Sequence, residues 1–270
     1  MRDFPQALSN LLSKENVFYY DAVYESRDGL YYLAPVAEDL LLQVHSANLV
    51  EAVRQTGDFE AALYSAGGTV QAAGEIWKGT IDNAFVFTSF GDHHAGRDFY
   101  GGMCYFNGAA LAIASLRQKG MRRFAIVDTD AHHADGTRDI FARDNEVLHC
   151  CFCFQDYQDQ YNKMDVRIPY RTTDEYYLER MKQAFVQKTL DFAPEIIFWE
   201  YGFDATRGEY GDKGLSRDCH LKIAEIIKGV ADHACRGRMV AILCGGSGRR
   251  LAAYTIPHII AILAELEAGQ

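Results

Sequence analysis

The chain has 270 residues, of which 49% are hydrophobic, and a formal net charge of −10 at pH 7. This length allows a large buried core in one large domain or two ordinary ones, and the acidic balance argues against a protein that binds the nucleic-acid backbone. The N-terminal segment lacks the cationic start and apolar run of a signal peptide, and no stretch approaches the ~18 apolar residues of a membrane span. We expect a cytoplasmic protein without nucleic-acid or membrane partners, whose acidity is compatible with a cationic substrate.

Seven cysteines, an odd number, are scattered through the chain. A chain of this size does not need a disulfide framework, so reduced thiols are the simplest interpretation. Cys150, Cys151 and Cys153 are spaced closely enough to suggest a metal cluster. The run LHCCFCF around them is short and apolar, however, which favours a buried strand.

Short apolar runs alternate with longer helical patterns along the chain. Thr172 followed by Glu175 predicts a capping box for one of these helices. In chain order, we predict helices over Ala37–Val53 and Thr69–Trp77, a strand over Ala84–Ser89, a helix over Gly102–Lys119, strands over Arg123–Asp128 and Val147–Phe154, a helix over Asp174–Phe192, a strand over Glu195–Tyr201, a helix over Arg217–Cys235 and a strand over Met239–Cys244.

Strand–helix alternation of this kind predicts a parallel sheet that is covered on both faces. No linker, repeat or charge run divides the chain, so we expect residues 1–270 to form one α/β domain. Four of the five predicted strands run directly into unusual segments, which read GDHHAG, DTDAHHADGT, GFDA and GGSGRR. Ligands of open parallel sheets bind beyond the carboxyl ends of the strands. These segments, although distant in sequence, should therefore converge on one rim.

The segment Asp128–Asp135 contains candidate metal ligands. Residues two apart in an extended chain point the same way, so Asp130 and His132 can present their side chains to one metal ion. A carboxylate with an imidazole suits zinc, and a catalytic zinc takes three protein ligands and an open position. Asp204, at the end of another strand, is the expected third ligand.

His93 and His94 form a second pair, at the neighbouring strand end. Asp128 and Asp135 are not needed as zinc ligands, so each can orient one imidazole and stabilise its protonated form. The sequence therefore predicts two acid/base histidines, without deciding which one removes a proton and which one donates it.

Several segments together resemble the histone deacetylase family. They are GDHHAGRDFYGGMCYFNGAALAIA, IVDTDAHHADGTRDIF and YGFDA, with weaker similarity in LLLQVHSANLVEAV and SAGGTVQAA. The resemblance implies an arginase–deacetylase fold, which is a three-layer αβα structure around a mostly parallel eight-stranded sheet. It also implies zinc-dependent hydrolysis of a linear amide, in an acylated lysine, an acylated polyamine or a small acylated amine.

The resemblance also assigns site residues. Its zinc ligands are Asp130, His132 and Asp204, and its acid/base histidines are His93, paired with Asp128, and His94, paired with Asp135. Gly102 would meet the substrate through its backbone, and Met103 stands where the family usually has a phenylalanine of the tunnel wall. The family also binds a structural potassium ion, whose positions here are Asp128, the carbonyls of Asp130 and His132, Cys151 in place of a usual serine, and Phe152.

The match is broken in the last glycine-rich loop. Many family members have a tyrosine there, and this chain has Ser247. Losing one oxyanion donor typically costs ~10²–10³ in turnover. Three interpretations stay open: Tyr210, Arg249 or Arg250 supplies another donor, the natural acyl group is more labile, or the protein only binds acylated ligands. Arg249 and Arg250 could equally begin a solvated helix.

Two rival classes remain beside the hydrolase. Arginase-like ureohydrolases bind two manganese ions and need a second pair of aspartates, whereas the later segment GFDA offers only one. A catalytically silent zinc protein that binds acylated ligands is the stronger rival, because of Ser247. Short loops around the rim also suggest either an open pocket or one completed by another subunit of a homo-oligomer.

Overall fold

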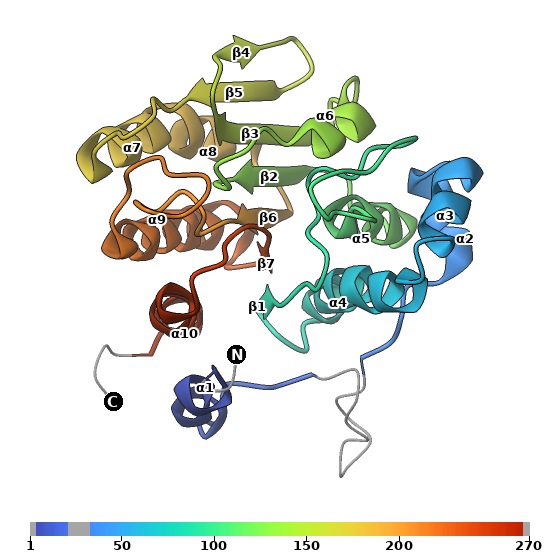
Figure 1. The fold of residues 1–270 in the computed structure, drawn as a ribbon, viewed down its shortest axis with the longest axis horizontal. Helices are drawn as coiled ribbons and strands as arrows, with labels where there is room; N and C mark the ends of the chain where they lie inside the picture. Colours follow the sequence, from blue (N-terminus) through green and yellow to red (C-terminus); the bar gives the residue numbers. More distant parts are fainter. Residues whose placement is uncertain (1–3, 21–32, 267–270) are drawn as a thin grey trace.

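The computed structural model describes residues 4–20 and 33–266 of the chain (Figure 1). The helices are α1 (Phe4–Leu12), α2 (Glu38–Val44), α3 (Ala47–Arg54), α4 (Phe59–Lys78), α5 (Gly108–Gln118), α6 (Asp135–Phe141), α7 (Asp174–Met181), α8 (Gln187–Phe192), α9 (Arg217–Cys235) and α10 (Arg249–Leu263). The strands are β1 (Asn83–Val86), β2 (Phe124–Asp128), β3 (Val147–Cys153), β4 (Tyr157–Gln158), β5 (Lys163–Arg167), β6 (Ile196–Tyr201) and β7 (Met239–Leu243).

The strands form one sheet in the order β1-β7-β6-β2-β3-β5-β4. Every neighbouring pair is parallel except β4 with β5. The described residues thus hold seven strands, where the resemblance implied eight. The apolar pattern predicted five of them and missed β4 and β5. β4 has only two residues, and β5 (KMDVR) alternates charged with apolar side chains instead of forming an apolar run.

Helices cover both faces of the sheet, as expected for a parallel sheet (Figure 1). Successive residues of a strand point to opposite faces. In β2, Phe124 and Ile126 pack into a core with α2, α3, α4 and α5, while Ala125 and Val127 pack into a second core with α7, α9 and α10. All four side chains are fully buried. The fold is therefore the three-layer αβα arrangement that the strand–helix alternation indicated.

Side-chain caps place several helix boundaries away from the predicted ones. The helix expected over Ala37–Val53 is two helices, because His45 is extended and the Ser46 hydroxyl caps α3 by accepting from Leu49 N. The helix expected from Gly102 begins at Gly108 instead. There, Asn107 accepts from Ala110 N, and the preceding residues form a loop.

The predicted capping box of Thr172 and Glu175 is wrong. Thr173 is the N-cap of α7, and its hydroxyl accepts from Tyr176 N. The helix expected over Asp174–Phe192 is also not uniform, because a π-helical turn over Lys182–Val186 separates α7 from α8.

Among the described helices, none combines the length and the apolar character that crossing a bilayer requires.

His45 ties together Gly96 and Asn107, which lie near the two ends of the loop before α5. Its Nε2 accepts from Asn107 N at 3.1 Å, and its Nδ1 donates to the Gly96 carbonyl at 2.8 Å, so both bonds require the neutral ring. Burial lowers the pKa of His45 from 6.5 to about 4. The unfolded chain therefore binds the proton more readily, and the stabilisation is complete above pH 6.5 and lost as the pH falls toward 4.

We expect the free energy of unfolding to fall between pH 6.5 and 4, with His45 contributing at most about 3 kcal/mol. The variant His45→Gln should flatten this pH dependence, which urea unfolding at several pH values would measure. His233→Gln, at an exposed position of α9, is the matched control and should keep the slope of the unmodified protein. Equal slopes for His45→Gln and the unmodified protein would contradict the assignment.

Candidate active site

Four loops meet at one edge of the sheet because their strands are neighbours. β1, β7, β6 and β2 lie side by side and parallel, so their carboxyl ends share an edge. The loops after them carry His93 with His94, the segment from Gly245 to Gly248, Asp204, and Asp130 with His132. The convergence expected from the sequence is present in the fold.

Asp130, His132 and Asp204 bring three ligand atoms together. His132 Nδ1 lies 2.9 Å from Asp130 Oδ1 and 3.0 Å from Asp204 Oδ2. Both carboxylates are buried, whereas the His132 side chain is 44% exposed. Ligand atoms around a tetrahedral zinc with bonds of about 2.0–2.2 Å would lie roughly 3.3–3.6 Å apart, so small movements would accommodate the ion.

The charges of this group also fit a cation. Asp204 Oδ1 accepts from Ala131 N, but the buried Asp204 Oδ2 has no hydrogen-bond donor despite its closeness to His132. Burial and the charge of Asp130 raise the pKa of Asp204 to about 6. The carboxylates of Asp130 and Asp204, which both lie close to Nδ1, raise the pKa of His132 to about 10. A buried carboxylate oxygen without a donor is costly, and a divalent ion would satisfy it.

Two imidazoles lie beside the group of Asp130, His132 and Asp204, which we call the metal group. Each imidazole forms a hydrogen bond with an aspartate. His93 Nδ1 contacts Asp128 Oδ2 at 2.7 Å, and His94 Nδ1 contacts Asp135 Oδ1 at 2.6 Å. Their ring centroids are 4.2 Å apart. Each carboxylate holds a proton on Nδ1 and leaves Nε2 of the ring available for proton transfer.

The environments of the two imidazoles differ. The His93 side chain is buried, and although burial opposes its protonation, the charges of Asp128 and Asp130 raise its pKa well above the ordinary value. The His94 side chain is 20% exposed. Burial and repulsion from His93 lower the pKa of His94, although Asp135 opposes this. The pKa values of the two imidazoles are thus shifted in opposite directions, upward for His93 and downward for His94.

The loop before α5 lies against His94. Gly102 and Met103 both have positive φ, 55° and 63°, in a tight turn closed by a hydrogen bond from Cys104 N to the Gly101 carbonyl. A side chain at Gly102 would collide with the His94 ring, which brings the backbone of this turn next to the imidazole. Met103 is 71% exposed.

Tyr210, and not Ser247, lies next to the metal group. The Tyr210 ring stacks on His132 with centroids 5.7 Å apart, and its hydroxyl accepts from Gly246 N at 2.8 Å. A side chain added at Gly245 would collide with the carboxylates of Asp130 and Asp204 and with this hydroxyl, so all three surround Gly245. Because the hydroxyl accepts a backbone hydrogen bond, its own proton is available for another acceptor.

Ser247 is exposed and bonded elsewhere. Its hydroxyl donates to Glu209 Oε2 at 2.9 Å, and its amide donates to the same oxygen at 3.0 Å. Arg249 and Arg250 form the exposed first turn of α10, as the helix-start interpretation expected. Of the three donors considered to replace the missing tyrosine, only Tyr210 has contacts with the metal group.

The positions that the resemblance assigns to potassium gather behind the metal group. Asp128 Oδ1 accepts from Asp130 N at 2.9 Å, and Cys151 Sγ lies 3.7 Å from the His132 carbonyl. Phe152 follows Cys151 in β3. Cys151 therefore places sulfur where an oxygen ligand was expected.

Two buried acids near the site were not found from the sequence. Asp92 accepts from Gly108 N and Ala109 N, both at 2.9 Å, and so anchors the start of α5. Glu200 groups with His93 and Asp128, and burial with the charge of Asp128 raises its pKa well above the ordinary value. The available signal was a charged residue inside the apolar run EIIFWEY, which is unusual for a strand that is buried on both faces.

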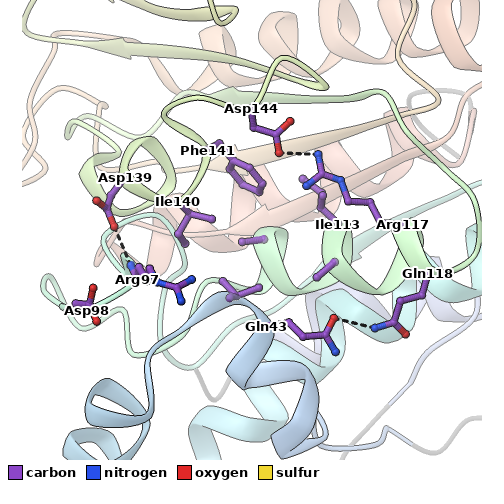
Figure 2. A pocket seen from close by; sticks show the side chains of 13 residues that line it. Gln43, Arg97, Asp98, Ile113, Arg117, Gln118, Asp139, Ile140, Phe141 and Asp144 are labelled. Carbon is purple, nitrogen blue, oxygen red and sulfur yellow. Dashed lines mark hydrogen bonds and ion pairs between the residues drawn. The ribbon is translucent and has the colours of Figure 1, made fainter.

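A separate hollow of about 530 Å³ lies between α2, α5 and α6 (Figure 2). Its polar side chains pair with one another. Arg117 contacts Asp144 at 2.6 Å, and Gln118 donates to Gln43 at 2.9 Å. None of the metal group, the imidazole pair or Tyr210 lines it, so the hollow is a seam between helices and lies apart from the candidate site.

Fold and site together define an α/β protein with three clustered side chains that could hold a metal ion and two aspartate-bound imidazoles, at the carboxyl edge of a parallel sheet. The sequence profile of the histone deacetylase domain matches residues 51–263. The chain therefore belongs to the histone deacetylase family.

Two relatives agree with this assignment, and one solved structure shares the fold. A probable deacetylase of Archaeoglobus fulgidus is 30% identical over 227 residues, covering 77% of this chain and 62% of the relative. A histone deacetylase-like amidohydrolase of Pseudomonas aeruginosa is 26% identical over 244 residues, covering 78% of this chain and 64% of the relative. The chain thus spans about three fifths of the length of these relatives. The crystal structure of the HDA15 HD domain, 21% identical, shares the fold with a TM-score of 0.83 over 98% of this chain and 80% of that one.

We expect Asp204→Asn and His132→Ala each to lose one equivalent of bound zinc relative to the unmodified protein, because either change breaks the three-ligand group. Metal content per chain after zinc loading and desalting measures this. Glu209→Gln, a nearby carboxylate that instead accepts from Ser247, should keep the full content. Undiminished zinc in both ligand variants would rule out the group as a metal site.

Proposed function

We propose that this protein is a zinc-dependent amidohydrolase that removes an acyl group from an acylated amine through hydrolysis of a linear amide. The observation that supports it is the placement of Asp130, His132 and Asp204 beside two imidazoles that are each bonded to an aspartate. A zinc ion held by these three residues would polarise the amide carbonyl and lower the pKa of a bound water toward about 7. The remaining catalytic steps fall to side chains of the chain itself.

The two histidines have different roles in this proposal. His94 is the more accessible imidazole and lies against the Gly102 turn, so it suits removal of the water proton and its later delivery to the leaving amine. His93 is buried, and its Nε2 lies 3.7 Å from Asp130 Oδ1, so it suits a stationary positive charge beside the reacting water. Asp128 and Asp135 hold the two rings in orientation.

Tyr210 supplies the oxyanion donor in place of the tyrosine that is missing at position 247. Its hydroxyl shares the space around Gly245 with the carboxylates of the metal group and has a proton free to donate. In this position the proton would stabilise the negative charge that develops on the oxygen of the amide carbonyl. The loop after β6 thus takes over a role that the family usually places in the loop after β7.

The substrate class follows from the relatives and the charge. An acetylpolyamine amidohydrolase of Pseudomonas aeruginosa is 42% identical over 87 residues, covering 32% of this chain and 25% of the relative. Together with the net charge of −10, this supports a cationic acylated amine, either a polyamine or a lysine. Three points stay predictions: residues 1–270 act as one domain, they work alone or as a homo-oligomer, and they bind a potassium ion.

His94→Ala should retain the zinc content and lose about 10²–10⁴ in turnover, because the proton-transfer group is gone while the metal ligands remain. Release of free amine from acetylated lysines, acetylated polyamines and trifluoroacetylated amides measures the turnover. His258→Ala, an exposed histidine of α10, is the control and should match the unmodified protein. A fully active His94→Ala would refute the assigned chemistry, and zinc-loaded protein that releases no amine from any substrate would instead indicate a binding protein.

Tyr210→Phe should lower kcat by about 10²–10³ with little change in KM, because phenylalanine keeps the ring on His132 and removes the oxyanion donor, together with the acceptor of the Gly246 N–H. Ser247→Ala should stay near the unmodified rate, since that hydroxyl is bonded to Glu209. The opposite ranking of these two variants would show that the donor lies in the loop after β7.

A further inference from the structure

We propose that His133, Cys151, Cys153 and Asp165 form a second metal site, which binds a thiophilic divalent ion, namely Zn²⁺. It shares no residue with the group of Asp130, His132 and Asp204, and it does not depend on the proposed hydrolysis. Two of its four side chains are the closely spaced thiols whose sequence pattern favoured an ordinary buried strand.

The strand register brings the four residues together. Cys151 and Cys153 are two apart in β3, so their side chains share one face of the sheet. Asp165 is the register partner of Cys151 on the neighbouring strand β5 and points to the same face. His133 reaches this face from the loop after β2, the strand on the other side of β3. Ligands from three adjacent segments thus meet above β3.

The separations of the ligand atoms are equal to or slightly larger than those around a tetrahedral ion. With Zn–S bonds of about 2.3 Å and Zn–N or Zn–O bonds of about 2.0–2.2 Å, ligand atoms lie roughly 3.3–3.8 Å apart. His133 Nδ1 lies 3.5 Å from Cys153 Sγ, 3.6 Å from Asp165 Oδ1 and 4.0 Å from Cys151 Sγ. All four atoms are within 4.8 Å of one another. A small contraction would complete the coordination sphere.

Neighbouring side chains balance the charge and orient the carboxylate. Arg138 donates to Asp165 Oδ1 at 2.5 Å, and Gln155 donates to Asp165 Oδ2 at 2.7 Å. Two thiolates, one carboxylate, one divalent ion and the Arg138 guanidinium cancel in total charge. A neutral total matters because the two cysteines and Asp165 are buried, and an uncompensated charge would be costly there. Such outer partners are a regular feature of protein metal sites.

The donor set distinguishes this site from the expected potassium site. Potassium binding would use oxygen atoms around Asp128, whereas the cluster offers two sulfurs and an imidazole nitrogen. Soft thiolate ligands with tetrahedral geometry select zinc over hard cations such as potassium. Only Cys151 belongs to both sets. An ion can reach the cluster from the side of His133, whose side chain is 19% exposed and contacts the exposed ring of Phe154.

Cobalt substitution tests the proposal independently of activity. Thiolate ligands give Co²⁺ a charge-transfer absorption in the near ultraviolet, whereas a site of two aspartates and one histidine does not. The full chain, purified under reducing conditions and loaded with Co²⁺, should show this absorption and should bind two Zn²⁺ per chain in a parallel sample. Asp204→Asn should keep the absorption and lose one zinc, which separates this proposal from the proposed function.

Variants of the cluster, unlike Asp204→Asn, should lose the charge-transfer absorption. Cys153→Ala should lose the absorption and one zinc, and so should His133→Gln, which alters a partly exposed side chain and leaves the buried strand intact. Cys235→Ala, a buried thiol that donates to the Arg238 carbonyl far along the chain, is the control and should keep both. Absence of the thiolate absorption in the unmodified protein, or a Cys151–Cys153 disulfide in protein purified under reducing conditions, would overturn the proposal.

Discussion

The candidate site depends on one electrostatic constraint, which is that two buried carboxylates approach the same imidazole nitrogen. Asp130 Oδ1 and Asp204 Oδ2 lie 2.9 and 3.0 Å from His132 Nδ1, and a single proton on that nitrogen cannot satisfy both. Like charges buried in this way need a compensating cation or the protonation of one carboxylate. The nearby glycine at position 245 follows from the same crowding, since a side chain there would collide with both carboxylates. A positive charge at this point would relieve the repulsion between the two carboxylates.

The parallel sheet makes this constraint possible. Because β2, β6, β7 and β1 are consecutive in the sheet, the loops that follow them meet at one edge, although they are scattered through the sequence. The same geometry places Tyr210 over His132 from the loop after β6, where it can replace the tyrosine that is absent at Ser247. In the proposed function, the donor thus comes from the loop after β6.

Farther along the sheet, β3 and β5 contain an arrangement that the family resemblance does not account for. Cys151 replaces a serine, and Cys153, His133 and Asp165 surround its sulfur. These residues are explained together by one soft ion, whereas as core residues each would need a separate explanation. A structural ion here would tie β5 and the loop after β2 to β3, and would thereby stiffen the support behind Asp130 and His132.

The sequence by itself determined the fold class, the order of the main strands and the family, because apolar runs and the spacing around His93, Asp130 and Asp204 are local patterns. It could not predict β4, β5 or the start of α5. Those elements depend on charged residues that become buried only through partners such as Arg138, and on caps such as Asn107 and Asp92. Only the tertiary structure decided that Tyr210 rather than Arg249 or Arg250 lies at the metal group, and that two neighbouring strands bring Cys151 and Asp165 together. These are contacts between distant segments, and their distances are fixed by packing and strand register, which single-chain periodicity does not contain.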